Sequence, residues 1–187
     1  SHKFDLPVIS VGNLIAGGSG KTPMVEYIIR LLHEDNIIAT LSRGYKRKTN
    51  GYRLAGDNET VDTIGDEPLQ YHQKFDSVKV AVSECRKKGI QKLLVDVPDL
   101  DVVILDDAFQ HRYVKPGLSI VVTDYFKLFT KDWLLPFGRL REYSSGRKRA
   151  DIIVVTKTPR IFSPIVRKQL IEEIQPFPGQ LVCFSYI

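Results

Sequence analysis

The chain has 187 residues, of which 43% are hydrophobic and 26% charged, and its formal net charge is +5 at pH 7. This length leaves room for one domain, and the apolar share excludes a disordered chain. The mild basic excess suits an anionic partner such as a phosphate compound or a membrane surface, and no recognised motif supports a nucleic-acid partner. Cys85 and Cys183 share no short spacing, which excludes a disulfide framework and a Cys-rich zinc site.

Short apolar runs alternate with longer amphipathic stretches along the whole chain. The runs are rich in Val and Ile, apolar on both faces and too short to span a bilayer, and they predict buried parallel strands at 7–11, 37–41, 78–82, 102–105, 118–122, 152–155 and 181–184. Helical periodicity predicts helices at 22–34, 67–75, 87–95 and 163–174. This alternation predicts an α/β fold of the P-loop NTPase type, with three layers and a mostly parallel, doubly wound sheet.

The first predicted strand is followed by a glycine-rich turn and a helix. This order predicts a nucleoside triphosphate site, because consecutive N–H groups of such a turn can surround phosphate oxygens at the helix N-terminus. Lys21 is expected to bridge the β- and γ-phosphates, and the Thr22 hydroxyl to ligate Mg²⁺. The strict pattern has a glycine where Ile15 stands, which is a departure in detail. The predicted nucleotide contacts are Ile15, Ala16, Gly17, Gly18, Ser19, Gly20, Lys21 and Thr22.

A buried strand that ends in an aspartate is the second part of such a site. The run at 102–105 leads into Asp106 and Asp107, which are predicted to hold Mg²⁺ directly or through water. A plain surface turn is the alternative for these two residues alone. Guanine-reading proteins place an aspartate where Pro159 stands, so adenine, and hence ATP, is the favoured nucleotide.

Seven motifs extend the pattern over residues 8–151. They are VISVGN (8–13), AGGSGKTP (16–23), LSRGYKR (41–47), GDEP (65–68), DDAFQHR (106–112), LLP with GRLRE (134–142) and RAD (149–151). In this order they resemble the tetraacyldisaccharide 4'-kinase family of the lipid A pathway in Gram-negative bacteria. The resemblance implies transfer of the γ-phosphate of ATP to the 4'-hydroxyl of an acylated disaccharide 1-phosphate.

The resemblance also implies roles that local pattern alone does not assign. Locally, residues 65–68 predict a helix start with Asp66 as the cap. By resemblance, Asp66 is the base that takes the proton of the sugar hydroxyl. Arg141 is the best candidate for stabilising the transferred charge, with Glu142 positioning it. The family further implies that residues 1–187 are the catalytic lobe of a longer protein with an N-terminal membrane helix and a C-terminal domain, peripheral to the cytoplasmic face of the inner membrane.

Five aromatic residues fall between Tyr125 and Phe137, interspersed with lysines. Such a segment could lie at a membrane surface or hold acyl chains, and an ordinary core-packing loop is the alternative. The basic run 147–149 is either solvated or placed against anionic lipid. At the level of function, the alternative to a kinase is a nucleotide switch whose hydrolysis drives partner binding.

Overall fold

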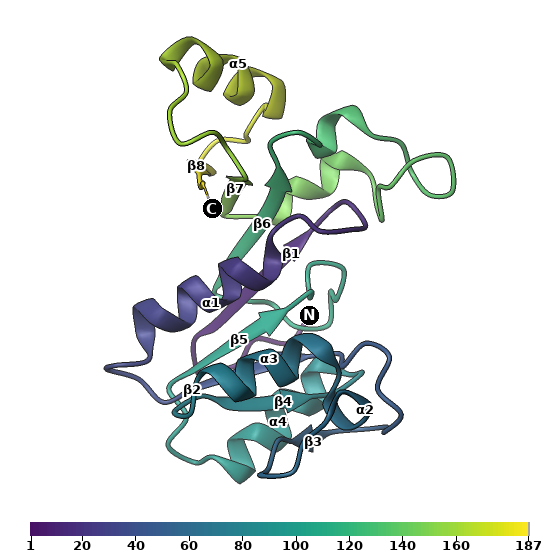
Figure 1. Ribbon diagram of the computed structural model, residues 1–187, viewed down its shortest axis with the longest axis vertical. Coiled ribbons are helices and arrows are strands. Elements are labelled where there is room, and N and C mark those ends of the chain that lie inside the picture. The colour runs from purple at the N-terminus through teal and green to yellow at the C-terminus, as the bar shows by residue number, and fades with distance from the viewer. Residues whose placement is uncertain (187) are drawn as a thin grey trace. The chain divides into compact units, whose positions relative to one another are not determined.

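The computed structural model describes residues 1–186 and has alternating strands and helices (Figure 1). The strands are β1 (Val8–Asn13), β2 (Ile38–Ser42), β3 (Arg53–Leu54), β4 (Lys79–Val82), β5 (Val102–Asp106), β6 (Leu118–Asp124), β7 (Ile152–Thr156) and β8 (Leu181–Phe184). The α-helices are α1 (Lys21–Leu32), α2 (Val61–Ile64), α3 (Asp66–Lys74), α4 (Arg86–Asp96) and α5 (Pro164–Ile174). Two 3₁₀ helices, η1 (Phe129–Lys131) and η2 (Ser144–Arg149), interrupt the segment between β6 and β7.

The chain divides into two compact units. Unit 1 comprises residues 1–11 and 22–117, and unit 2 comprises residues 12–21 and 118–187. One of the boundaries runs between Lys21 and Thr22, so residues 15–21 of the predicted phosphate loop belong to unit 2, and Thr22 with the rest of α1 belongs to unit 1. The sequence-based prediction of a single lobe stays a prediction.

Unit 1 is a parallel sheet with one antiparallel edge. Its strands follow the order β3-β4-β2-β5-β1, and all neighbours are parallel except β3 and β4. The register sets Ser10 of β1 beside Leu105 of β5, and Leu41 of β2 beside the same Leu105. The central strands β1, β2 and β5 are short and almost entirely buried, as expected for a sheet between two helical layers.

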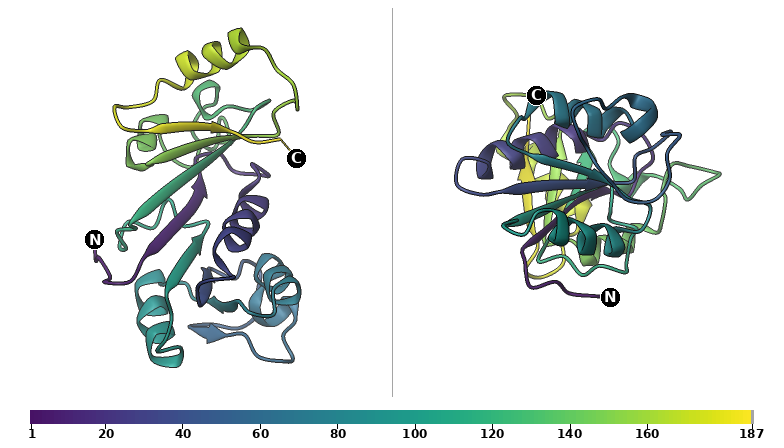
Figure 2. Two further views of the ribbon diagram at one scale, coloured as in Figure 1. Left: turned by 90° about the vertical axis from the view of Figure 1, so that its left-hand side faces the viewer. Right: turned by 90° about the horizontal axis from the view of Figure 1, so that it is seen from below.

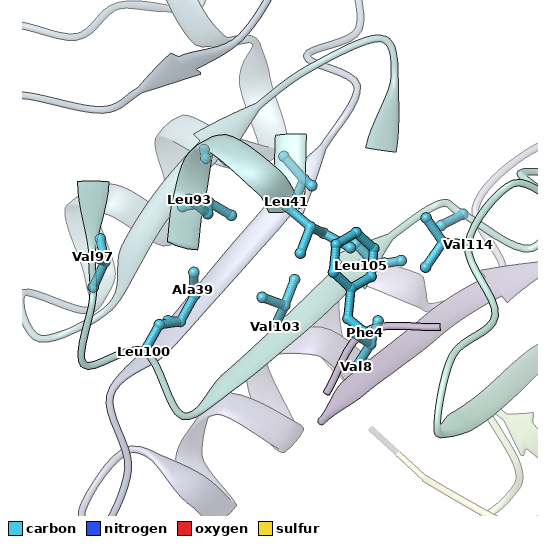
Figure 3. Packing of buried hydrophobic residues seen from close by; sticks show 13 residues of the cluster. Phe4, Val8, Ala39, Leu41, Leu93, Val97, Leu100, Val103, Leu105 and Val114 are labelled. Carbon is cyan, nitrogen blue, oxygen red and sulfur yellow. The ribbon is translucent and has the colours of Figure 1, made fainter. Parts of the chain in front are cut away.

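Helices cover both faces of the unit 1 sheet, with α3 on one side and α4 on the other (Figure 2). Beneath α4, apolar side chains of that helix and of β2, β4 and β5 form one cluster with Phe4 and Val8 (Figure 3). On the α3 side, α1 is fastened to α3 through the buried Glu26, which accepts from Gln70 (2.7 Å) and Lys74 (2.6 Å). The predicted three-layer, doubly wound arrangement is confirmed in this unit.

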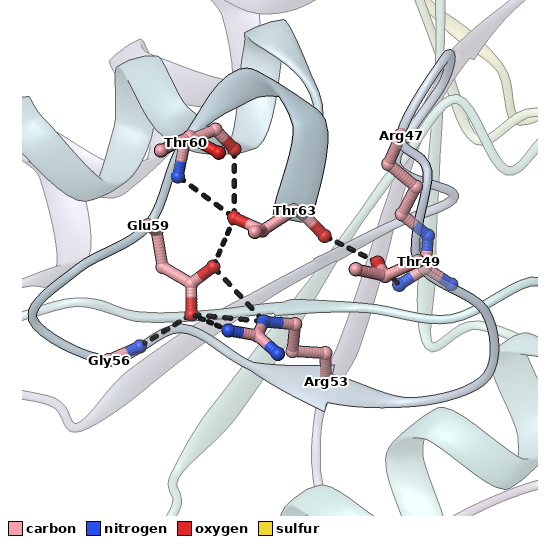
Figure 4. A network of polar contacts seen from close by, with 7 residues as sticks. All are labelled: Arg47, Thr49, Arg53, Gly56, Glu59, Thr60 and Thr63. Atoms are coloured by element: carbon pink, nitrogen blue, oxygen red, sulfur yellow. Dashed lines mark hydrogen bonds and ion pairs between the residues drawn. The ribbon is translucent and has the colours of Figure 1, made fainter.

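Residues 44–64, which connect β2 to α3, are ordered by polar contacts (Figure 4). Glu59 accepts from the Arg53 guanidinium (3.0 Å), the Gly56 N–H (3.2 Å) and the Thr63 hydroxyl. Thr60 and Thr63 form a capping box at the start of α2. Burial raises the pKa of Glu59, but these hydrogen bonds outweigh it and hold the pKa below its usual value. The short β3 and α2 therefore depend on side-chain partners rather than on periodicity.

Unit 2 contains the parallel strands β6, β7 and β8 in that order. Helix α5 buries Leu170 and Ile174, and its first turn is capped by the Ser163 hydroxyl, which accepts from the Val166 N–H at 3.3 Å. The long segment between β6 and β7 buries Leu128 and Phe129, so part of it does pack in the core.

Candidate functional site

The predicted phosphate loop follows β1 directly and leads into α1. Gly17 (φ +115°) and Gly20 (φ +85°) occupy backbone conformations that favour glycine. A Cβ at Gly20 would also lie 3.2 Å from the Thr156 side chain, which would have to move by a few tenths of an ångström to admit another residue. Gly17 and Gly18 are exposed, whereas Ile15 and Ser19 are buried. Phosphate binding by the N–H groups of this glycine loop stays a prediction.

Three side chains outside the glycine motif fasten the loop within unit 2. The Asn13 amide donates to the Ser19 hydroxyl at 2.7 Å, from the end of β1. The Thr156 hydroxyl, at the end of β7, donates to the Ser19 carbonyl at 2.8 Å. The Lys157 ammonium donates to the Gly18 carbonyl at 2.6 Å and to the Asp124 carboxylate at 2.7 Å. These bonds fix the loop's shape before any ligand is bound.

Residues 139–141 pair with the start of the loop through backbone hydrogen bonds. The Ala16 N–H donates to the Arg139 carbonyl at 2.7 Å, and the Arg141 N–H donates to the Leu14 carbonyl at 2.8 Å. Ile15 and Leu140 form an antiparallel bridge between these two bonds. The structure therefore brings the predicted cation Arg141 beside the predicted phosphate loop, although the two motifs are more than 100 residues apart in the sequence.

In unit 1, one buried tyrosine connects two of the predicted magnesium ligands. The Tyr71 hydroxyl, on α3, donates to Oδ2 of Asp106 at 3.0 Å, at the end of β5. The Thr22 side chain hydrogen-bonds the same hydroxyl from the start of α1. Tyr71 is fully buried, and this burial together with the Asp106 carboxylate raises the pKa of its phenol. Tyr71 thus stays protonated and holds the Thr22 hydroxyl and the Asp106 carboxylate in one hydrogen-bonded chain.

Arg86 supports the same strand end from the other side. Its guanidinium is buried and donates to the Ser83 carbonyl at 2.7 Å and to the Asp106 carbonyl at 3.1 Å. Burial lowers the pKa of Arg86 to about 10, although Asp106 and Asp107 oppose that shift. Asp107 itself adopts a left-handed conformation (φ +48°), so the chain changes direction immediately after Asp106. Burial and the nearby Arg86 lower the pKa of His111, which favours its neutral form.

The candidate base Asp66 is exposed at the first residue of α3. The helix start is confirmed, but the expectation that Asp66 caps it is wrong, because Gly65 (φ +93°) takes the cap position. A Cβ at Gly65 would lie 3.0 Å from the Tyr45 carbonyl oxygen and 3.2 Å from Gly44. Only glycine allows this approach, which joins the SRGY and GDEP motifs side by side within unit 1.

Two other charged residues have partners that the sequence did not indicate. Arg47, which follows β2 at the end of the LSRGYKR motif, has a side chain only 2% exposed and pairs with Glu84. It therefore holds residues 44–64 in place. Glu142, expected to position Arg141, pairs with Arg149 at 2.7 Å.

Within residues 1–186, no helix is long and apolar enough to cross a membrane. Over the same residues, no cluster of three or more His, Cys, Asp or Glu side chains is arranged to hold a metal ion. A magnesium ion bound here would need oxygen ligands from a nucleotide and from water in addition to protein, as is usual for this ion.

Comparison with known proteins identifies related chains over almost the whole length. The sequence profile of the tetraacyldisaccharide-1-P 4'-kinase family matches residues 1–182. The tetraacyldisaccharide 4'-kinase of Bacteroides thetaiotaomicron is 53% identical over 186 residues, which cover 99% of this chain and 49% of that protein. The enzyme of the same name from Flavobacterium psychrophilum is 50% identical over 174 residues, 93% of this chain and 51% of that protein. The chain thus spans about half the length of these relatives.

Two solved structures are similar to this chain. LpxK from Aquifex aeolicus, crystallised in complex with ATP, matches with a TM-score of 0.78 at 37% identity, covering 97% of this chain and 54% of that one. HypB from Helicobacter pylori, in complex with nickel, matches with a TM-score of 0.59 at 16% identity, covering 97% of this chain and 79% of that one. The second likeness shows the α/β fold alone.

Proposed function

Because the chain belongs to the tetraacyldisaccharide 1-phosphate 4'-kinase family, we propose that it carries the nucleotide-binding and transfer residues of such a kinase. The reaction moves the γ-phosphate of ATP to the 4'-hydroxyl of a tetraacyldisaccharide 1-phosphate. The family match over residues 1–182, joined to the pre-shaped glycine loop before α1, is the observation that carries this proposal. The same match favours a kinase over a nucleotide switch.

The phosphate loop supplies the binding site for the donor. The N–H groups of Gly17, Gly18 and Gly20 and the helix dipole of α1 attract phosphate oxygens, and Lys21 adds a positive charge at the first residue of that helix. In phosphoryl transfer, the protein contributes mainly position and charge, so a loop that keeps its shape without ligand spends little free energy on ordering. The bonds from Asn13, Thr156 and Lys157 serve this purpose.

Thr22, Asp106 and Asp107 are the residues proposed to hold Mg²⁺. Hydroxyl and carboxylate oxygens suit this hard cation, and Thr22 and Asp106 already meet on the Tyr71 hydroxyl. When bound, the ion neutralises phosphate charge. The role of Tyr71 is to keep the Asp106 carboxylate oriented, because a buried carboxylate without a partner would turn or take up a proton.

Asp66 and Arg141 are proposed to act on the transferred group. A sugar hydroxyl is a poor nucleophile, and the exposed Asp66 carboxylate accepts its proton as the phosphoryl group arrives. The Arg141 guanidinium stabilises the negative charge that spreads over the phosphoryl oxygens. Backbone bonds of residues 139–141 to the phosphate loop keep Arg141 at the donor side of unit 2.

We propose that the acceptor is an acylated disaccharide phosphate and that the protein works as a peripheral protein at the cytoplasmic face of the bacterial inner membrane. The names of the relatives support the acceptor. The net charge of +5 supports contact with anionic lipid.

The test is to incubate the protein with Mg²⁺ and ATP against a panel of acylated disaccharide phosphates and to follow product by mass spectrometry. The proposal expects one added phosphate on the tetraacylated 1-phosphate and none on deacylated sugar. ATP hydrolysis that requires a protein partner and leaves every acceptor unchanged would refute the kinase and support the switch.

A further inference from the structure

The segment between β6 and β7 exposes large apolar side chains to solvent. Leu128 and Phe129 are buried, but the chain then presents Trp133 (76% exposed), Leu135 (56%) and Phe137 (92%). Exposed aromatic side chains that cluster within a few residues mark an interaction surface rather than a chance exposure. The sequence left open whether this aromatic segment packs in the core or forms an interaction surface. The segment packs in the core at Phe129 and exposes apolar side chains after it.

This surface is carried by a closed hairpin, by which we mean residues 132–140. Oδ1 of Asp132 accepts the Trp133 N–H (2.9 Å) and the Arg139 N–H (3.0 Å), and Oδ2 accepts the Arg139 guanidinium (2.9 Å). The Leu140 N–H donates to the Trp133 carbonyl at 2.9 Å. A Cβ at Gly138 would lie 2.3 Å from that carbonyl oxygen, so the closure requires glycine. The hairpin therefore holds its exposed side chains in a defined arrangement.

The hairpin is joined directly to the phosphate loop. The Arg139 carbonyl accepts from the Ala16 N–H, the N–H of Arg141, just after the hairpin, donates to the Leu14 carbonyl, and Leu140 bridges Ile15 between these two bonds. Whatever binds the tip of the hairpin is consequently tied to the donor loop through a few residues of hydrogen-bonded backbone.

Charge identifies the kind of partner. Unit 2 contains 12 Lys and Arg against 6 Asp and Glu, a net charge of +6, while unit 1 contains 15 against 16, a net charge of −1. All of the chain's positive excess thus lies in the unit that carries the hairpin. Lys127 and Lys148, in the same segment between β6 and β7, are exposed. Aromatic and aliphatic side chains combined with basic ones are the pattern of an interfacial membrane contact, because the rings enter the headgroup region while the cations meet anionic lipid.

We propose that the hairpin is a membrane-docking element that inserts Trp133, Leu135 and Phe137 into the surface of an anionic bilayer. The inference rests on the proposed function, since a kinase for an acylated acceptor must work where that acceptor resides. It adds a physical link, because the docking element and the donor phosphate loop share the strand pairing of Ile15 with Leu140. Docking then sets how far the donor loop lies from the lipid surface.

Trp133 is the only tryptophan of the 187 residues and serves as the probe. The chain is titrated with phosphatidylcholine vesicles, with and without about one third anionic phosphatidylglycerol. We expect the Trp133 emission to shift to the blue and to be quenched by brominated acyl chains with the anionic vesicles, and both effects to weaken as salt rises. An unshifted, unquenched emission, or equal binding to neutral and anionic vesicles, overturns the proposal.

A double variant, Leu135→Ser with Phe137→Ser, tests the apolar part. We expect vesicle binding to fall by about tenfold or more for each side chain removed. The control is Val95→Ser with Tyr113→Ser, which alters two side chains of unit 1 that are each 77% exposed and should leave vesicle binding unchanged. Unchanged binding of the hairpin variant, or an equal loss in the control, overturns the proposal, and the quenching measurement on the unsubstituted chain decides even if a variant fails to fold.

Calorimetric titration with ATP separates this inference from the proposed function. Vesicle binding without any ATP binding would refute the kinase and leave the docking element standing. ATP binding and phosphate transfer without vesicle binding would refute the docking element alone.

Discussion

Unit 1 and unit 2 differ in charge, in exposed surface and in the functional groups that they carry. Unit 1 has a net charge of −1 and contains the candidate base Asp66 and the candidate magnesium ligands Asp106 and Asp107. Unit 2 has a net charge of +6 and contains the phosphate loop, Lys21 and Arg141. The groups proposed to accept a proton or bind a cation are thus concentrated in one unit, and the groups proposed to bind phosphate are concentrated in the other.

The two units also order their long segments differently. In unit 1, residues 44–64 are tied down by polar contacts such as those of Arg47 with Glu84 and of Glu59 with Arg53. In unit 2, residues 125–150 keep apolar side chains exposed on a hydrogen-bonded hairpin. Loop length alone therefore does not indicate function. The contacts of the loop decide whether it is scaffold or binding surface.

Removal of the loop cation should have the largest effect. We expect Lys21→Ala to lower phosphate transfer by about 10³-fold or more and to weaken Mg·ATP binding, because unit 2 loses a positive charge beside the β- and γ-phosphates. Calorimetry and a kinase assay measure the two parts. Lys168→Ala removes a solvent-exposed lysine of the same unit and is the control. Equal ATP affinity in both variants would contradict the phosphate-loop assignment.

The candidate base in unit 1 should affect transfer without affecting donor binding. We expect Asp66→Asn to lower the transfer rate by about 10²- to 10⁴-fold, the usual contribution of a general base, while the affinity for ATP stays unchanged. Asp62→Asn, which alters an exposed carboxylate paired with Lys48, is the matched control. A normal transfer rate in Asp66→Asn would show that Asp66 is not the base, and unit 1 would then lack the proton-accepting role proposed for it.

Tyr71→Phe tests the hydrogen-bonded chain between Thr22 and Asp106. The ring and its packing remain, but Asp106 loses a donor, so we expect the Mg²⁺ concentration needed for tight nucleotide binding to rise about tenfold. Binding measured with a fluorescent ATP analogue over a range of Mg²⁺ gives this value. Tyr52→Phe removes another hydroxyl bonded to a carboxylate, that of Asp96, and should change thermal stability alone. The same Mg²⁺ dependence in both variants would make Tyr71 purely structural.

The nucleotide site should prefer adenine to guanine. Pro159 follows Lys157 where guanine readers have an aspartate, so we expect ATP to compete for the site about tenfold more strongly than GTP, the worth of one good hydrogen-bond difference. Competition against the fluorescent analogue provides the ratio. Tighter binding of GTP would revive the switch interpretation.

The smallest expected effect is a pH dependence of the hairpin. Burial raises the pKa of Asp132, but the N–H groups of Arg139 and Trp133 and the Arg139 guanidinium outweigh it and lower the pKa below its usual value. The carboxylate therefore stabilises the hairpin fully above the unfolded pKa of about 3.9, and this stabilisation is lost as pH falls through the lowered folded value. Trp133 anisotropy should drop on acidification below about pH 4, whereas Asp132→Asn should show low anisotropy already at neutral pH. Superimposable titrations of the two proteins would exclude Asp132 as the closing group.

Much of the fold could be predicted from the sequence because burial controls it. The runs at 78–82 and 102–105 match β4 and β5 within one residue, because strands buried between two helical layers form short, nearly continuous apolar runs. The periodic stretch at 87–95 matches α4 within one residue at each end. The short β3 and α2 could not be predicted, because Glu59 and its partners hold them and no apolar period marks them.

The candidate site could be predicted only where a motif is contiguous. The glycine loop and the strand-end aspartates are local patterns with a direct chemical meaning. Tyr71, Thr156 and Lys157 could not be recognised, because each acts through a partner distant in sequence, namely Asp106, Ser19 and Gly18. The prediction that Asp66 caps α3 was wrong because it, too, depended on a contact distant in sequence. The close approach of Gly65 to Gly44 and Tyr45 decides where α3 begins.

The proposed transfer of phosphate from ATP to the 4'-hydroxyl can be followed with a labelled γ-phosphate. The protein is given Mg²⁺, γ-labelled ATP and purified tetraacyldisaccharide 1-phosphate, and the label is located by fragmentation mass spectrometry. We predict that ADP forms only when acceptor is present, in equal amount to a product that carries the label on the 4'-oxygen. Formation of ADP at the same rate without acceptor, with the disaccharide recovered unlabelled, would contradict the proposed phosphate transfer.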